Sequence, residues 1–317
     1  MRILVTGGAG FIGSHLCDAL VEAGHDVTAL DNFITGNPDN IAHLKSEPNF
    51  HFMEQDVSKL FASAGSWEAI FHLASPASPV GYGKYPLETM MVNSMGTHNM
   101  LNIACAYGAS FLFASTSEVY GDPDLEHHPQ SEDYWGNVNP IGVRSCYDES
   151  KRFGEALTFS YMLLHDVDAR IIRIFNTYGP RYDSEDGRII PNFITQALRG
   201  DPITVYGDGL QTRSFCYVSD LVDGIIKAMF AEGTKGEVIN LGNPDERTVL
   251  GVAEIIRKLT GSKSPIVYML ARDEEIARRQ PDVRKAKRIL NWQPQTSLEA
   301  GLAETVGWFK VKIQASK

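Results

Sequence analysis

The sequence has few cysteines, and their arrangement excludes two common kinds of site. They form no C-x-x-C pair and have no metal-type spacing, so we expect free thiols in a reducing compartment and no disulfide framework. The adjacent His127 and His128 come without further ligands, and we predict no metal site. The 317 residues contain only four cysteines, at Cys17, Cys105, Cys146 and Cys216.

A long apolar run and an excess of basic residues are also missing. Arg2 already begins the first predicted strand, and no segment of about 20 apolar residues follows. We therefore expect no signal peptide, no membrane anchor and a cytoplasmic protein. The formal net charge is −10 at pH 7, which argues against nucleic acid or an anionic membrane as the main partner. A small anionic ligand is still compatible with this charge, because a few local Arg and Lys can outweigh the mean field.

What the chain does contain is a glycine turn between a strand and a helix. The apolar residues 3–5 lead into Thr6–Gly13, an amphipathic helix is expected over 14–22, and a second strand covers 26–30. This second strand ends on Asp31. Strand, glycine turn, helix, strand and acid follow one another in the order that a dinucleotide site needs.

Each glycine of this turn has a physical role. Gly7 permits the tight turn, Gly10 lets the backbone approach a pyrophosphate, and Gly13 lets helix and strand pack closely. The spacing is G-x-x-G-x-x-G, a variant of G-x-G-x-x-G, and the helix amino terminus offers free N–H groups to phosphates. Asp31 suits hydrogen bonds to both ribose hydroxyls and would repel a 2′-phosphate. We therefore predict NAD, not NADP, as the cofactor.

Strands and helices continue to alternate through the first half of the chain. Apolar strands are expected at 50–55, 69–74 and 111–118, which predicts a parallel sheet covered by helices on both faces. Ligands of such sheets lie beyond the carboxyl ends of the strands. The predicted cofactor-binding residues are Gly7, Gly10, Phe11, Ile12, Gly13, Asp31, Asn32, Asp56, Val57, Leu73 and Ser75, with Tyr147 and Lys151.

The predicted fold class is α/β, a Rossmann-type doubly wound parallel sheet with a smaller, interleaved C-terminal α/β substrate domain. We assign residues 1–180 to the NAD-binding domain, with 213–241 returning to it, and 181–317 mainly to the substrate domain. No repeat or long linker separates them. Ser219 and Asp220 are expected to cap the helix that follows Val218.

Tyr147 and Lys151 stand four apart in an apolar-periodic segment, so a helix presents both side chains on one face. A nearby cation favours the phenolate, and we expect it to lower the pKa of Tyr147 toward neutrality and make it a proton acceptor. Tyr-x-x-x-Lys alone favours an ordinary half-buried pair on an amphipathic helix. Ser117 and Glu118, at the end of a buried strand, strengthen the catalytic interpretation.

These motifs together resemble an extended short-chain dehydrogenase/reductase. More narrowly, the chain is similar to the UDP-glucuronate decarboxylase (UDP-xylose synthase) family over nearly its whole length. Glu118, which directly follows Thr116-Ser117, distinguishes the motif from those of related epimerases and 4,6-dehydratases. The segments that carry the resemblance are 72–79, 116–123, 128–130, 134–136, 139–142, 147–152, 173–181 and 279–282.

The resemblance implies a reaction and a set of roles. NAD would oxidise C4 of UDP-glucuronate, the 4-keto acid would lose carbon dioxide, and the hydride would return to give UDP-xylose. Tyr147 and Lys151 would handle the 4-hydroxyl proton, Ser117 would hold that oxygen, and Glu118 and Arg279 would orient the carboxylate and govern proton delivery. The substrate-binding residues implied are Asn176, Arg188, Asn192, Tyr206, Arg213 and Arg279.

Several points stay open at this stage. The family often carries a lysine where this chain has Met91, so the exact sugar is left undecided. The alternatives are a UDP-glucuronate or UDP-hexose 4-epimerase and, from another class, a non-catalytic NAD-binding sensor. Apolar residues on several faces of the helices at 90–107 and 152–164 predict a homodimer through a four-helix interface. These residues are Met100, Ile103, Tyr107, Leu157, Tyr161 and Leu164.

Overall fold

A seven-stranded sheet forms the centre of the computed structural model, which describes residues 1–59, 66–270 and 279–315. All its strand pairs are parallel, in the order β11-β6-β5-β4-β1-β2-β3. This confirms the predicted Rossmann-type doubly wound sheet. The strands are β1 Arg2–Thr6, β2 Asp26–Asp31, β3 Phe50–Glu54, β4 Ala69–His72, β5 Ser110–Thr116, β6 Ala169–Ile174 and β11 Val238–Leu241.

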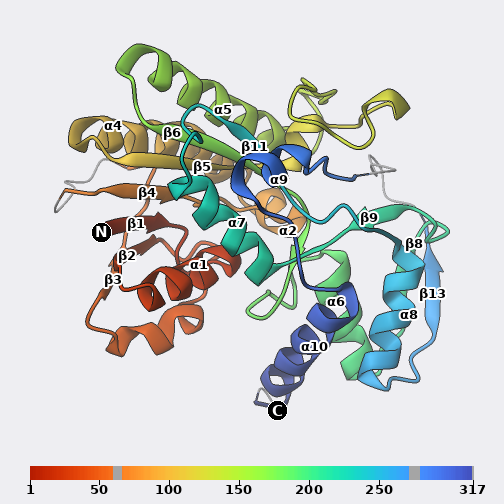
Figure 1. The fold of residues 1–317 in the computed structure, drawn as a ribbon. Helices are drawn as coiled ribbons and strands as arrows, with labels where there is room; N and C mark the ends of the chain where they lie inside the picture. Colours follow the sequence, from red (N-terminus) through yellow and green to blue (C-terminus); the bar gives the residue numbers. More distant parts are fainter. Residues whose placement is uncertain (60–65, 271–278, 316–317) are drawn as a thin grey trace.

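Helices cover both faces of the sheet, because its central strands are apolar on both sides. Ile3 and Val5 of β1 pack against Leu16 and Leu20 of α1 on one face of the sheet, whereas Leu4 packs on the opposite face. Figure 1 shows α4 and α5 on one side of the sheet and α1 and α7 on the other. The helices are α1 Phe11–Glu22, α4 Thr97–Tyr107, α5 Ser145–His165, α7 Val218–Phe230 and α9 Arg284–Leu290.

A second hydrophobic core lies beyond the carboxyl ends of the strands, at the lower right of Figure 1. Phe193 and Ile194 of α6, Val252 of α8 and Leu302 of α10 are buried within it. Its elements are α6 Ile189–Arg199, β8 Ile203–Tyr206, β9 Thr212–Ser214, β12 Glu246–Thr248, α8 Val249–Thr260, β13 Ile266–Met269 and α10 Leu298–Ala315. The chain leaves the sheet after β6 and comes back to pair β11 with it.

Short elements lie at the carboxyl edge of the sheet, between the sheet and the second core. A continuous helical segment is formed by α3 Pro86–Met91, a π-helical turn at Val92–Gly96 and α4. The remaining short elements are α2 Pro79–Lys84, β7 Thr177–Tyr178, β10 Cys216–Tyr217, and 3₁₀ turns at Pro38–Ser46, Ser117–Tyr120 and Leu125–His127.

The expected cap of α7 is wrong. Tyr217 occupies the N-cap position without a side-chain hydrogen bond, and the helix begins at Val218. The Asp220 carboxylate accepts instead from the Thr296 N–H at 2.8 Å, so it ties α7 to the segment before α10.

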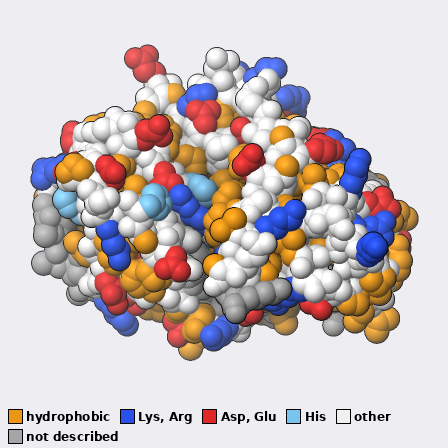
Figure 2. All heavy atoms as spheres, turned by 90° about the horizontal axis from the view of Figure 1, so that it is seen from below, with side chains coloured by type: hydrophobic (Ala, Val, Ile, Leu, Met, Phe, Trp, Pro, Cys, Tyr) orange, Lys and Arg blue, Asp and Glu red, His pale blue; other side chains and the backbone are white. Residues whose placement is uncertain are grey.

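The surface carries no concentration of one charge on the face seen in Figure 2, where acidic and basic side chains are interspersed. Among the described helices, none has the length and apolar character that a membrane crossing requires.

Candidate active site

A cavity of about 1200 Å³ opens between the carboxyl ends of the strands and the second core. It reaches from Gly10 and Asp31, beside β1 and β2, to Arg213 and Arg279. This volume exceeds the roughly 300–1,000 Å³ of a typical single-ligand pocket. The cavity can therefore hold two ligands that meet between its ends.

The glycine turn leaves no room for side chains, as a dinucleotide cradle requires. Gly7 has a φ of +72°, and a Cβ there would lie 2.9 Å from the Ala74 backbone. A Cβ on Gly13 would lie 2.1 Å from the Gly7 carbonyl oxygen. The helix α1 begins directly after Gly10, so its free N–H groups face the cavity wall where phosphates would sit. These features fit the pyrophosphate of NAD.

Asp31 ends β2 with its carboxylate held by the backbone. Its Oδ2 accepts from the Ala9 N–H at 3.0 Å and its Oδ1 from the Phe33 N–H at 2.8 Å. Burial raises the pKa of this carboxyl, and these backbone donors oppose the shift. A strand-end carboxylate held in this way suits a ribose diol.

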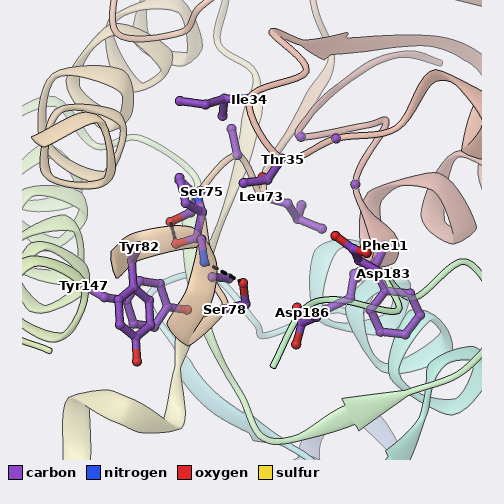
Figure 3. A pocket seen from close by; sticks show the side chains of 18 of the residues that line it. Phe11, Ile34, Thr35, Leu73, Ser75, Ser78, Tyr82, Tyr147, Asp183 and Asp186 are labelled. Atoms are coloured by element: carbon purple, nitrogen blue, oxygen red, sulfur yellow. Dashed lines mark hydrogen bonds between the residues drawn. The ribbon is translucent and has the colours of Figure 1, made fainter. Parts of the chain in front are cut away.

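The structure brings all the predicted cofactor residues to this cavity (Figure 3). Phe11 lies at one end of the close-up view and the Tyr147 ring at the other, with Leu73 and Ser75 between them. The lining includes Gly7, Gly10, Phe11, Ile12, Gly13, Asp31, Asn32, Asp56, Val57, Leu73, Ser75, Tyr147 and Lys151.

Tyr147 and Lys151 are both buried and both line the cavity, as their helical spacing predicts. The Lys151 ammonium donates to the Ala114 carbonyl at 2.8 Å and lies 5.9 Å from the centre of the Tyr147 ring. Burial lowers the pKa of Lys151 to about 7. Burial also raises the pKa of the Tyr147 phenol. The expected lowering of the Tyr147 pKa by Lys151 is therefore wrong for the protein alone, since desolvation outweighs the charges around the phenol.

Two neighbours of Tyr147 were missed by the sequence reasoning. The Thr116 hydroxyl, not that of Ser117, hydrogen-bonds the Tyr147 side chain, and it also accepts from the Glu118 N–H at 3.2 Å. The Tyr82 ring stacks on Tyr147 with 5.3 Å between centroids (Figure 3). Thr116 stood within the recognised motif, one position from the predicted serine, whereas nothing in the sequence distinguished Tyr82.

Asn93 stands in the π-helical turn and holds two serines that flank the site. Its amide nitrogen donates to Ser75 Oγ at 3.1 Å and to Ser150 Oγ at 3.0 Å. Its side-chain oxygen is buried without a hydrogen-bond partner. A π-turn is frequent at functional sites because it redirects side chains of an otherwise regular helix. Here it ties the cofactor loop to α5.

Glu118 lies between two arginines at the end of the cavity nearest Tyr147. Its Oε1 pairs with Arg279 and its Oε2 with Arg144, which precedes α5. These cations hold the pKa of Glu118 at about 2, against the effect of its burial. Glu118 is therefore ionised at neutral pH in the protein alone.

Asp148 stands behind Arg144, with its Oδ2 3.7 Å from Arg144 Nε. Burial raises the pKa of this carboxyl to about 7, and the negative charge of Glu118 adds to the shift. The sequence reasoning assigned no role to Arg144 or Asp148, although both stand in the segment around Tyr147, four residues apart.

The predicted substrate residues divide into two groups. Arg188 lines the cavity and donates to the Ala77 carbonyl and, at 2.7 Å, to the Tyr182 hydroxyl. Asn192 and Tyr206 do not belong to the lining; Asn192 stands one turn into α6, and Tyr206 is the last residue of β8. The lining residues that were predicted are Ser117, Glu118, Asn176, Arg188, Arg213 and Arg279.

Met91 also lines the cavity, with 46% of its surface exposed. The described part of the chain contains no cluster of three or more His, Cys, Asp or Glu side chains arranged to hold a metal ion.

A family model and several known proteins match most of this chain. The family described as NAD dependent epimerase/dehydratase matches residues 3–242. UDP-glucuronic acid decarboxylase 1 of Danio rerio is 49% identical over 314 residues, which cover 99% of this chain and 73% of the relative. UDP-glucuronic acid decarboxylase 1 of Arabidopsis thaliana is 50% identical over 313 residues, covering 99% and 71%.

Solved structures share the fold over almost the whole chain. UDP-glucuronic acid 4-epimerase from Bacillus cereus, in complex with UDP-glucuronic acid and NAD, is 32% identical with a TM-score of 0.86, covering 98% of this chain and 100% of that one. UDP-glucose 4-epimerase from Thermotoga maritima, with UDP-glucose, is 31% identical with a TM-score of 0.90, covering 99% and 100%.

Proposed function

Because the chain belongs to the NAD dependent epimerase/dehydratase family, we propose that it is an NAD-dependent nucleotide-sugar decarboxylase that converts UDP-glucuronate to UDP-xylose. The observation that carries this proposal is the ionised Glu118 held between Arg144 and Arg279 beside Tyr147. Arginine forks match carboxylates well, so these cations suit a substrate that carries a carboxylate. Relatives about half identical over 99% of this chain, named UDP-glucuronic acid decarboxylases, support the same reaction.

The residues of the site suggest how the chain performs it. Bound NAD supplies a hydride acceptor that returns the same hydride, so no reductant is consumed. Tyr147 takes the proton of the sugar 4-hydroxyl in its phenolate form, and its side chain is held by Thr116. Lys151, close to the same ring, stabilises the phenolate charge before this transfer, while Ser117, the residue after Thr116, lines the same wall of the cavity.

Oxidation at C4 gives a 4-keto acid, whose carbonyl accepts the electrons released when the C5–carboxylate bond breaks. Carbon dioxide leaves, and a proton that comes ultimately from solvent water adds to C5 before C4 is reduced. Glu118 and Arg279 stay charged throughout, so their part is to orient the substrate and to balance its charge. Tyr147 returns its proton to the 4-oxygen in the last step.

Two other functions are less well supported. A 4-epimerase needs the keto sugar to turn over in its site, and the epimerases of solved structure are 31–32% identical to this chain, whereas the relatives named decarboxylases are 49–50% identical. A sensor without catalysis needs neither Tyr147 nor Lys151, and both are buried at the cavity wall. Asn176, Arg188 and Arg213, all lining residues, are proposed to hold the nucleotide diphosphate end of the substrate.

Incubation with UDP-glucuronate and no added reductant tests this function. Mass spectrometry is expected to find UDP-xylose as the main product, with an equal amount of carbon dioxide released. Formation of UDP-galacturonate without carbon dioxide would assign the epimerase function instead. Unchanged substrate would favour the non-catalytic NAD-binding sensor.

We further infer a cytoplasmic homodimer formed by α4 and α5 of two chains. Of the residues predicted to form this interface, Met100 and Tyr161 are buried within the chain, whereas Tyr107 and Leu164 are 43% and 74% exposed. Other apolar side chains extend the exposed face, and their burial in a four-helix interface would remove them from water. They are Met95, Phe153, Phe159 and Leu163.

A further inference from the structure

Gln130 is a fully buried polar residue beside the segment that carries Arg279. Its side-chain Oε1 accepts from the Gln280 N–H at 2.9 Å, and its own N–H donates to the Gln280 carbonyl at 2.9 Å. The Gln130 carbonyl in turn accepts from the Asp282 N–H at 2.9 Å. Three hydrogen bonds to one residue therefore hold the backbone that directly follows Arg279.

The side-chain amide of Gln130 is itself held in one orientation. Its Nε2 donates to the His127 carbonyl at 3.3 Å and lies 3.3 Å from His128 Nδ1. The amide nitrogen is therefore occupied on one side, and Oε1 is directed at Gln280. Because Gln130 is fully buried, no water replaces these partners, and the loss of one leaves a polar group unpaired at a cost in free energy.

The same network reaches the guanidinium of Arg279. Asn240, also fully buried, donates from Nδ2 to the Gln130 carbonyl at 3.0 Å and accepts at Oδ1 from the Tyr120 hydroxyl at 2.7 Å. Tyr120 immediately precedes Gly121, whose carbonyl accepts from Arg279 Nη2 at 3.3 Å. One buried network therefore holds both the backbone after Arg279 and an acceptor of its side chain.

We propose that Gln130 is a positioning residue that holds Arg279 against Glu118 and so sets the orientation of the substrate without touching it. This inference rests on the proposed function, in which Glu118 and Arg279 orient the substrate. Gln130 is not among the residues that line the cavity. An arginine fork matches a carboxylate only in a defined orientation, so a small shift of the backbone at Arg279 changes the fit at the reacting carbons.

A double-mutant cycle tests this role, because a positioning residue loses its effect when the residue that it positions is gone. Gln130→Met keeps the length of the side chain but accepts no hydrogen bond from Gln280. It is expected to lower kcat/KM for carbon dioxide release from UDP-glucuronate about tenfold and to change the affinity for NAD less than about twofold. In the Arg279→Gln background the same substitution is expected to cost less than about twofold more.

Gln196→Met is the matched control. Gln196 also accepts from a backbone N–H, that of Thr204 at 3.0 Å, and donates to the Thr204 hydroxyl at 2.8 Å, but it stands on α6 outside the cavity lining. Its substitution is expected to lower the melting temperature and to leave kcat/KM unchanged. Gln130→Asn withdraws the amide from Gln280 by one carbon and is the milder variant for the same cycle if Gln130→Met does not fold.

The outcomes separate this inference from the proposed function. Losses that multiply in the double variant, as they do for independent residues, would overturn the positioning role of Gln130. A loss of kcat/KM in Gln196→Met equal to that in Gln130→Met would overturn it as well. A wild-type protein that releases no carbon dioxide would instead refute the proposed function, and the same cycle, measured in the affinity for UDP-glucuronate, would then decide on Gln130 separately.

Discussion

At the scale of single residues, the site is governed by charges that burial has taken out of water. Desolvation raises the pKa of Tyr147 and lowers that of Lys151, so in the protein alone the phenol stays protonated at neutral pH and the lysine is only partly charged. Glu118 resists the same effect only because two arginines hold it. Catalytic power at Tyr147 must therefore come from what the site binds as well as from its own residues.

The raised pKa of Asp148 predicts a pH dependence of substrate binding. Asp148 faces Glu118 and Glu149 as well as the cations Arg144 and Arg279. Below about pH 7 it is protonated and adds no negative charge beside these cations. As the pH rises through about 7 it ionises, pairs more strongly with Arg144 and repels the substrate carboxylate, so the affinity for UDP-glucuronate falls several-fold.

Titration of UDP-glucuronate between pH 6 and pH 8.5 measures this effect. Asp148→Asn keeps the shape of the side chain and is expected to bind with an affinity that no longer changes across this range. UDP-xylose, without a carboxylate, provides the ligand control. An Asp148→Asn profile identical to that of the wild type would show that another group titrates.

Sequence reasoning reached the residues whose roles depend on local spacing. Tyr147 and Lys151 share a helix face, and their side chains follow from that alone. Thr116 contacts Tyr147 and Arg144 contacts Glu118, in each case a residue distant in the chain. The same is true of Arg279, which also pairs with Glu118. Asn192 and Tyr206 are not among the lining residues, and the direction in which α6 and β8 present their side chains depends on packing in the second core, which no local pattern predicts.

At the scale of elements, periodicity predicted the sheet well because its central strands are buried on both faces. Periodicity did not predict two features that depend on contacts between distant residues. The π-turn at Val92–Gly96 exists where Asn93 reaches across to Ser75 and Ser150. The predicted cap of α7 is absent because the Asp220 carboxylate instead accepts a hydrogen bond from the Thr296 N–H.

The close contact of α1 with the glycine turn predicts the result of a single substitution. Gly13→Ala would place a Cβ 2.1 Å from the Gly7 carbonyl oxygen, so we expect a loss of about 1–3 kcal/mol in the free energy of unfolding and weaker NAD binding. Denaturant unfolding and NAD titration measure both.

Gly307→Ala is the control for Gly13→Ala, because a methyl group added at Gly307 of helix α10 would meet no atom within 4 Å. It is expected to be neutral or slightly stabilising, since alanine favours a helix over glycine. Wild-type stability and NAD affinity in Gly13→Ala would contradict the close packing of this turn.

At the scale of the whole molecule, the exposed apolar side chains of α5 predict association. Leu163 is 73% exposed and Phe159 is 60% exposed. Leu163→Glu is expected to weaken a dimer strongly, because a charge would enter an apolar interface. Sedimentation velocity at micromolar concentration measures the change, with the exposed Leu210→Glu, outside α5, as control. A wild-type monomer would remove the basis for this interface.

The central claim is that a hydride leaves C4 of the sugar and comes back to it while carbon dioxide is lost. Its most direct test is to supply UDP-glucuronate carrying deuterium at C4, without added reductant, and to determine the label in the product by mass spectrometry. The account predicts UDP-xylose that retains the deuterium at C4. Carbon dioxide release with the label lost to water, or with reduced cofactor accumulating as substrate is consumed, would contradict it.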